Sequence, residues 1–462
     1  MDGPTLRYDP TIAAIRFGTG LGPRFARPAS AGDLLEELGG PDRMAEAFQL
    51  PGYDAAIARW HVYLSLRKQS SAATTKEEGD AVVDGIKAVR GAARADYLAG
   101  LRANVARAAQ AEYGFRERLV QFWADHFTVG YSVQILSQAI SAYVDEAIRP
   151  NLAGDFATLL KAAVTHVAML LYLDQTRSAG PNSRFAKNNP DRGLNENLAR
   201  EVLELHTLGV DADYSQSDVR QLAELFTGLS FKSGTGFVFR QGYVEPGAET
   251  VLGQTYKGGL EDIHAALDAL AAHPATARHL ARKLAVHFVD DNPPPALVDH
   301  VAAAYSASGG NLSATYAALL EHPSAWAPER RKVRQPFDYI AAALRALGVP
   351  GGKIAALPRR RARTQLLVPL QLMGQSWQRP DGPDGLPESA GAWVTPQGMA
   401  ARIQWGMRAP QALTDTLPDP RDFVVSALGG TAGADLNFAA GAAATRAEGI
   451  GLVLASPEFQ RR

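Results

Sequence analysis

Cysteine is absent from this chain of 462 residues. Its absence excludes disulfides, thiolate zinc sites, iron–sulfur clusters and cysteine nucleophiles. The compartment stays open, because the reducing cytosol and the oxidising periplasm both accept a chain without cysteine.

An excess of charge of either sign is also missing, since the formal net charge is -1 at pH 7. Nothing in this balance attracts the chain as a whole to nucleic acid or to an anionic membrane, so we expect no nucleic-acid partner. Apolar runs such as residues 162–173 are far shorter than a membrane span. The N-terminus lacks the basic start and apolar run that are typical of a signal peptide. We therefore expect no membrane span and, by default, a cytoplasmic protein.

Alanine and leucine are abundant, and this composition favours helices. We predict a mainly α fold, a multi-helical orthogonal bundle, with one small β-hairpin around residues 235–252, where FVFR alternates between glycines. We expect an irregular N-terminal segment (residues 1–30) and a helical core domain (31–330) that carries the polar motif. A C-terminal helical and loop region (331–462) should pack on this core.

The stretch NENLAREVLELHTLGV, residues 195–210, predicts an amphipathic helix with one charged face. At about 100° per residue, an arc of roughly 140° holds Glu196, Asn197, Arg200, Glu201 and Glu204. One interpretation is a solvated face, because the arginine lies at i,i+4 from two glutamates and would stabilise an exposed helix. The other is the wall of a cleft, in which Glu201 and Glu204 divide acid and base roles or hold a hard metal ion.

A second candidate is His126, within FRERLVQFWADHF at residues 115–127. It lies on the aromatic, apolar face of a predicted helix, so we expect it to be buried. It is either a core histidine bonded to a backbone carbonyl, or a base or metal ligand in the same pocket as the glutamates. A third stretch, HPATARHLARKLAVHF at residues 273–288, is interpreted as an ordinary amphipathic helix.

Two long segments rich in proline and glycine, residues 174–193 and 374–398, predict loops. The first leads directly into the charged helix and has the length of a loop that closes a cleft. The second contains Trp377 and Trp393, which would either stack on a sugar or pin the loop to the core.

These stretches together resemble a bacterial family, the one catalogued as domain of unknown function 1800. The motifs W-x-x-H-F and N-E-N-x-A-R-E-x-x-E-L are specific in combination, and matching pieces extend from IAAIRFGTGLGP to SPEFQ. The resemblance implies a mainly helical protein whose polar motif falls on His126, Asp174, Asn195, Glu196, Asn197, Arg200, Glu201 and Glu204. One departure is Val244, which stands before Glu245 where relatives often carry a histidine.

The activity of this family is not established, but its gene neighbourhood suggests a partner. Genes of the family often adjoin those of domain of unknown function 1501, whose members resemble alkaline-phosphatase-type enzymes and often carry a twin-arginine export signal. The resemblance therefore implies a candidate protein partner from that second family, and co-export with such a partner would leave the periplasm open beside the default cytoplasmic location.

Two functions fit these observations. The first is a hydrolase or transferase that acts on an envelope or polymeric substrate through a Glu/Arg/His centre, with a divalent metal as the candidate cofactor. Its candidate residues are His126, Glu196, Arg200, Glu201 and Glu204 for catalysis, Asp174, Asn195, Asn197, Trp377 and Trp393 for substrate binding, and Glu201, Glu204 and His126 for the metal. The second is a non-catalytic scaffold or partner protein. In an enzyme the charged arc should face a concave pocket together with His126, whereas in a scaffold it should be flat, open or paired with other helices.

Overall fold

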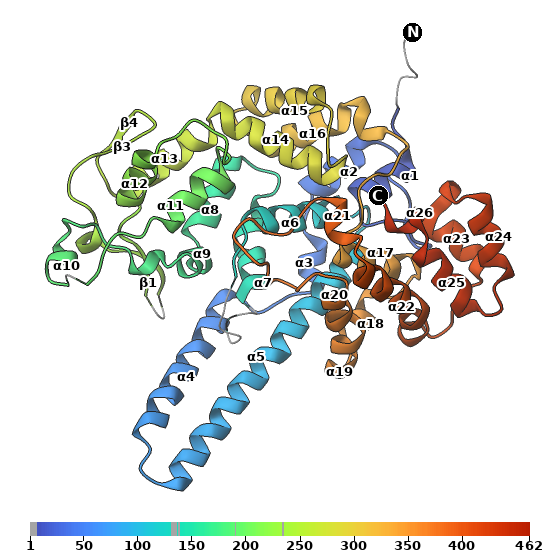
Figure 1. Cartoon of the computed structure of the whole chain (residues 1–462), viewed down its shortest axis with the longest axis horizontal. Coiled ribbons are helices and arrows are strands. Elements are labelled where there is room, and N and C mark those ends of the chain that lie inside the picture. The colour runs from blue at the N-terminus through green and yellow to red at the C-terminus, as the bar shows by residue number, and fades with distance from the viewer. Residues whose placement is uncertain (1–6, 131–135, 137–138, 190, 233–234) are drawn as a thin grey trace.

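The computed structural model describes residues 7–130, 136, 139–189, 191–232 and 235–462. Within them the chain is mainly helical, which confirms the predicted fold class (Figure 1). The strands of these residues form two antiparallel hairpins, β1 Leu229–Lys232 with β2 Gly236–Phe239, and β3 Glu249–Val251 with β4 Gln254–Tyr256. The sequence predicts a single hairpin here, but a two-residue turn at Leu252 and Gly253, both with positive φ, closes a second one.

In the N-terminal segment, residues 10–17 are helical, whereas residues 18–30 form neither helix nor strand. The helix α1 (Pro10–Ile12) continues into a π-helix, η1 (Ala13–Phe17). Asp9 caps this helix by accepting the backbone N–H groups of the next turn. Arg16 is buried and donates to the backbone oxygen of Ala325 (2.6 Å), so the segment belongs to the core.

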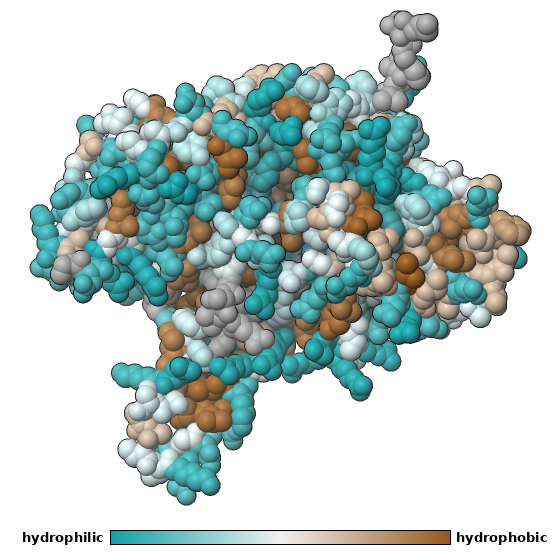
Figure 2. Space-filling model, viewed as in Figure 1, coloured by the Kyte–Doolittle hydropathy of each residue, from teal (hydrophilic) through white to brown (hydrophobic). Residues whose placement is uncertain are grey.

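Two long helices, α4 (Tyr53–Ala72) and α5 (Lys76–Gln110), form an arm that extends away from the body (Figure 1). Thr75 and Glu78 form a capping box that fixes the start of α5. Apolar side chains are exposed along the arm, as the space-filling view shows (Figure 2), and Val62 is 51% exposed. The first turns of α4, with Tyr53, Ala56 and Ile57 in the larger hydrophobic core, and the C-terminal part of α5 enter the body.

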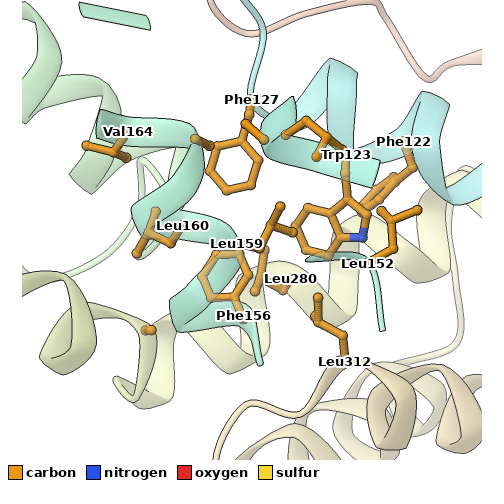
Figure 3. Close-up of a cluster of buried hydrophobic side chains, with 14 of the residues drawn as sticks. Phe122, Trp123, Phe127, Leu152, Phe156, Leu159, Leu160, Val164, Leu280 and Leu312 are labelled. Carbon is orange, nitrogen blue, oxygen red and sulfur yellow. The ribbon is translucent and has the colours of Figure 1, made fainter. Parts of the chain in front are cut away.

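The larger hydrophobic core surrounds Trp123 in α6 (Phe115–His126), whose side chain is fully buried. Figure 3 shows its ring among Phe127, Phe156 of α8 (Phe156–Thr165) and Leu280 of α14 (Pro274–Phe288). The indole Nε1 donates to the hydroxyl of Tyr316 at 2.6 Å, so the polar atom of this buried ring has its partner. These contacts hold the C-terminal end of α6 against α14, where the cavity described below opens.

The other helices of the first 330 residues pack around this core. They are α2 Ala31–Gly39, α3 Arg43–Ala47, α7 Ala139–Tyr143, η3 Val144–Ile148, η4 Arg149–Asn151, α9 Val167–Tyr172, η5 Gln175–Arg177, α10 Arg184–Lys187, α11 Asn197–Glu201, η6 Val202–His206, α12 Gln216–Leu225, η7 Gln241–Tyr243, α13 Leu260–Ala271, α15 Pro295–Ala307, α16 Leu312–Glu321 and η8 Pro323–Trp326. Many begin at a side-chain cap, such as Ser215 with Asp218 at the start of α12.

A second hydrophobic core joins the C-terminal helices to residues 98–109 of α5. The helices are α17 Pro336–Ala346, α18 Gly351–Ala355, α19 Arg359–Ala362, η9 Arg363–Leu367, α20 Val368–Leu372, α21 Ala390–Trp393, α22 Pro396–Leu413, α23 Pro420–Leu428, η10 Gly429–Thr431, α24 Ala434–Ala442, α25 Arg446–Ala455 and α26 Pro457–Gln460. The predicted division of the chain near residue 330 stays a prediction. Over the described part of the chain, no helix is both long and apolar enough to cross a membrane.

Candidate active site

A cavity of about 630 Å³ lies where the C-terminal end of α6 meets η6, α14 and the loop of residues 374–398. In Figure 1 this loop runs from α20 to α21 past α6. The cavity is lined by the titratable or charged residues Asp125, His126, Glu204, Asp211, Arg278, His279, Arg282, Lys283, Asp384 and Glu388. Its apolar lining includes Phe122, Leu205 and Val286. A cavity of this size and mixed lining is typical of small-molecule sites.

One face of α14 forms a wall of the cavity. His273 caps this helix and Pro274 occupies its first position, where a missing N–H does no harm. The lining residues Ala275, Arg278, His279, Arg282, Lys283 and Val286 follow the i, i+3, i+4 spacing of a single helix face. The opposite face is buried in the core, so packing fixes which side chains reach the cavity.

Three imidazoles lie close together at this wall. The ring centroid of His126 is 6.0 Å from that of His206 and 6.3 Å from that of His279. The Nε2 of His126 donates to the backbone oxygen of His206 (3.2 Å), and the Nε2 of His279 donates to that of Leu205 (3.1 Å). Burial lowers the pKa of His206 to about 3 and that of His279 to about 4, and it lowers the pKa of His126 well below its usual value. The three rings are therefore neutral at physiological pH.

Asp125 and Lys283 are two ionisable groups that share the cavity. Burial raises the pKa of Asp125 to about 7, against the smaller opposing effects of one backbone N–H and the Lys283 charge. That N–H belongs to Leu386 and lies 2.9 Å from Oδ1. Burial also lowers the pKa of Lys283, and nearby carboxylates only partly offset this. Asp125 is thus poised to exchange a proton near neutral pH, and Lys283 loses its proton more readily than an exposed lysine.

Glu388 begins a buried polar network behind the cavity. Its carboxylate accepts from His287 Nδ1 (2.5 Å) and from Lys332 Nζ (3.0 Å). Arg118 donates to Nε2 of the same imidazole (2.8 Å) and pairs with Asp338, so the imidazole must carry its proton on Nδ1. Burial raises the pKa of Glu388, but the histidine and the lysine outweigh it and lower that pKa to about 2.

The predicted charged helix is divided by the structure. It consists of α11 and a π-helical segment, η6, whose wider i→i+5 turns differ from the ideal helix assumed for its sequence. Glu204 lines the cavity together with His126, whereas Glu196 and Arg200 do not. Arg200 instead pairs with Glu196 (3.2 Å) and Glu204 (3.3 Å) and donates to Gln216 of α12 (3.0 Å). Burial and the neighbouring Glu204 raise the pKa of Glu201, which does not line the cavity.

The three predicted binding residues around the first long loop lie outside the cavity. Asp174 has a left-handed backbone and pairs with Arg177 (3.5 Å). The amide of Asn195 donates to the backbone oxygen of Leu173 (3.0 Å) and accepts the N–H of Asn197 (2.9 Å), so it holds the entry to α11.

The first long loop itself contains the short helices η5 and α10 and packs against the hairpin region rather than over the cavity. The ring of Phe185 stacks on Tyr243, with centroids 3.9 Å apart. The loop that contributes to the cavity is therefore the second one, and the expected lid role of residues 174–193 is not supported by their position. Val244 also lies outside the cavity, and Glu245 accepts from Asn182 (2.9 Å), so the departure at this position does not alter the cavity wall.

Both loop tryptophans are buried. Trp393 is 2% exposed and its Nε1 donates to the backbone oxygen of Pro387 (2.9 Å), which pins the loop. Trp377 is 3% exposed and stacks on Phe337, with ring centroids 5.1 Å apart. A sugar would reach either ring only if the loop moved.

Of the ten titratable or charged residues that line the cavity, only His126 and Glu204 are among the predicted site residues. Asp125 lies on the polar side of the helix predicted around His126, so the pattern gives no indication of its burial, and the acidic residues of the second loop have no spacing that marks them. His279, Lys283 and His287 do carry a signal, because their i, i+4, i+8 spacing places three titratable groups on one stripe of α14. Across the described residues, no group of three or more His, Asp or Glu side chains is placed so that it could hold a metal ion.

These contacts define a helical protein with a charged, partly enclosed cavity. The family model described as protein of unknown function (DUF1800) matches residues 16–461, so the chain belongs to this family. The resemblance seen in the motifs is thereby confirmed. Neither the curated proteins nor the solved structures include a significant match to the chain. The residues that line the cavity are therefore the basis for assigning its chemistry.

Proposed function

We propose that this protein is an enzyme of the hydrolase or transferase class, with its active site in the cavity between α6, η6 and α14. The observation that carries the proposal is that Asp125, Glu204 and Lys283 line one cavity that opens to solvent. Their environments differ, because one carboxyl has a pKa near 7 while the other is paired with Arg200. Separate environments for neighbouring titratable groups are how proteins divide acid and base roles.

Asp125 serves as the proton donor and acceptor in this proposal. At neutral pH about half of its population is protonated, so the group can act in either direction. Its backbone bond from Leu386 fixes the carboxyl orientation. His126 supports the site as a wall and positioning residue, since a neutral, fully buried imidazole is a weak base.

The volume of the cavity limits the size of the substrate that can bind in it. A cavity of about 630 Å³ accepts a small molecule or a single unit of a longer chain. An envelope or polymeric substrate would therefore place one unit or one end in the cavity, while the rest of it lies outside. Val210, which is 60% exposed, marks the open rim.

A panel of p-nitrophenyl esters, phosphates and glycosides tests this function with the purified full chain. We expect Asp125→Asn and Glu204→Gln to lower turnover of the active substrate by at least about 100-fold, the usual contribution of a general acid or base. The exposed acids Asp54 and Glu261 offer matched controls, and D54N and E261Q should retain activity. Equal activity in the cavity variants and the controls would contradict the proposal.

A divalent metal remains a proposal for the same site. Its candidate ligands are Glu201, Glu204 and His126, of which Glu204 and His126 line the cavity. Elemental mass spectrometry of the purified protein, with Glu201→Gln and His126→Ala as variants, tests it. Stoichiometric metal that disappears in both variants would support metal-assisted chemistry.

A second candidate function is a partner or scaffold role beside a protein of the domain of unknown function 1501 family. The observation in its favour is the half-exposed network of Arg200, Glu196 and Gln216, which joins α11 to α12 at the surface. Co-export with that partner would place the protein in the periplasm, and without it the cytoplasm is the default. Co-purification of the two proteins, with Arg200→Glu as the disrupting variant, tests this role.

A further inference from the structure

Lys283 differs from two other buried or partly buried lysines, Lys332 and Lys161, in its ion pairing. Lys332 lies 2.6 Å from Asp291 and 3.0 Å from Glu388, and Lys161 lies 2.6 Å from Asp268. The ammonium group of Lys283 has no such partner among the described residues, although its side chain is partly buried in the cavity wall. A cation in that position lacks the direct pairing that the other two have.

Two of the carboxyl groups near Lys283 already have hydrogen-bond partners, and the neighbouring imidazoles carry no charge. Glu388 accepts from His287 and Lys332, and Asp125 accepts from the backbone of Leu386. Asp384, which is also on the second loop, has the smallest effect of the three carboxyl groups on the pKa of Lys283. The neighbouring His126, His206 and His279 are neutral rings, because burial lowers the pKa of each. Burial accordingly lowers the pKa of Lys283, which increases the fraction of neutral, nucleophilic amine.

We propose that Lys283 is a nucleophile that forms an imine with an aldehyde or ketone bound in the cavity, an inference that rests on the proposed function. The Nζ lone pair attacks the carbonyl carbon, a C–N bond forms, and the carbonyl electron pair moves to oxygen, which takes up a proton. The C–O bond then breaks as water leaves. Asp125 supplies a proton to that hydroxyl and receives one from nitrogen, so the two amine hydrogens end in the water released.

The cavity fits a carbonyl compound with an apolar body. Phe122, Leu205 and Val286 supply apolar wall on the side of α6, η6 and α14. The amine comes from the middle of a well-packed helix rather than from a loop, so its position relative to this wall is fixed by the core. The carbonyl carbon of a bound compound would therefore be presented to Lys283 Nζ in the same geometry each time it binds.

Reductive trapping tests the inference on the intact chain. Propionaldehyde with sodium cyanoborohydride converts any imine to a stable propyl-lysine, which peptide mass spectrometry assigns to a residue. Lys161 is the matched internal reference, because its side chain is 28% exposed but is paired with an aspartate outside the cavity. We expect Lys283 to be modified at least about 10-fold faster than Lys161 at pH 7, because the cavity holds the aldehyde beside an amine whose pKa is lowered by burial.

The dependence on aldehyde concentration separates a binding site from a merely reactive amine. The rate at Lys283 should saturate, whereas the rate at Lys161 should rise linearly. Lys283→Met should remove only the fast component, with Lys161→Met as the control, and circular dichroism should show both variants folded. Equal rates at the two lysines, or a linear dependence at Lys283, would overturn the inference. If Asp125→Asn still abolishes turnover in the substrate panel under those results, the proposed enzyme survives and only the imine step fails.

Discussion

Two carboxyl groups at the cavity have pKa values displaced in opposite directions. Asp125 has a pKa near 7 because burial removes water and one backbone N–H replaces it. Glu388 has a pKa near 2 because His287 and Lys332 favour its charged form more than burial disfavours it. The first group can carry a proton at neutral pH, and the second stays ionised. This difference arises from the partners of each residue, not from residue type.

The raised pKa of Asp125 predicts a pH-dependent cost to stability. The neutral Asp125 carboxyl contributes fully to the stability of the folded protein below the ordinary pKa of about 4. This contribution is lost as the pH rises through about 7, because the folded protein then holds a buried charge. Asp125→Asn should therefore increase the free energy of unfolding by on the order of 3 kcal/mol at pH 8 and change it little at pH 4. Urea unfolding at both pH values measures this. The D54N control should be the same as wild type at each, and a destabilised D125N protein at pH 8 would refute the assignment.

The lowered pKa of Glu388 predicts the opposite dependence. Its stabilising contribution is present above the ordinary value of about 4.5 and is lost as pH falls toward about 2. Glu388→Gln should destabilise the protein by about 3–5 kcal/mol at pH 7, since it leaves Lys332 and its network without this charge. The difference from wild type should shrink as the pH falls from 5 to 3, which thermal unfolding in a pH series will show. A stability difference that does not change with pH would mean that Glu388→Gln acts through lost packing and not through the lost charge.

At the scale of elements, the amphipathic helices and their caps were predictable, but their contacts were not. The polar face of residues 195–210 shows plainly in the sequence, and Arg200 does pair at i,i+4 on both sides. The π-helical turn η6 leaves no such pattern, because it depends on how the helix packs. The second loop likewise shows its proline and glycine content, yet nothing in it indicates that Asp384 and Glu388 reach α14.

Gly385 is the point where this loop touches α6. Its φ of +81° is in the left-handed region, and an added Cβ would lie 2.8 Å from the backbone oxygen of Asp125. Gly385→Ala should therefore destabilise the protein by about 1–3 kcal/mol and should move the N–H of Leu386 away from that carboxyl. Gly391→Ala in α21, where a Cβ meets nothing within 4 Å, is the control and should be neutral or slightly stabilising. Chemical denaturation measures both; equal stability of the two variants would show that the loop adjusts freely.

At the scale of the whole molecule, the cavity is an assembly of distant segments. Asp125, Glu204, Lys283 and Glu388 come from α6, η6, α14 and the second long loop. The first three of these elements share the hydrophobic core around Trp123, part of which Figure 3 shows. Periodicity predicts which face of each helix is apolar, but it carries no information on which polar faces will meet. The mainly helical class was therefore accessible from composition, while most of the charged lining was not.

The arm of α4 and α5 has a practical consequence. At 1.5 Å per residue, the 35 residues of α5 extend over roughly 50 Å, and the turn after Ala72 lies at the end farthest from the body (Figure 1). A fluorophore, an affinity tag or an antibody epitope inserted there would stand clear of the cavity and of both cores. A label on the α4–α5 arm would therefore report the orientation of the protein in electron micrographs. The same position could be used to attach the protein to a surface in a defined orientation.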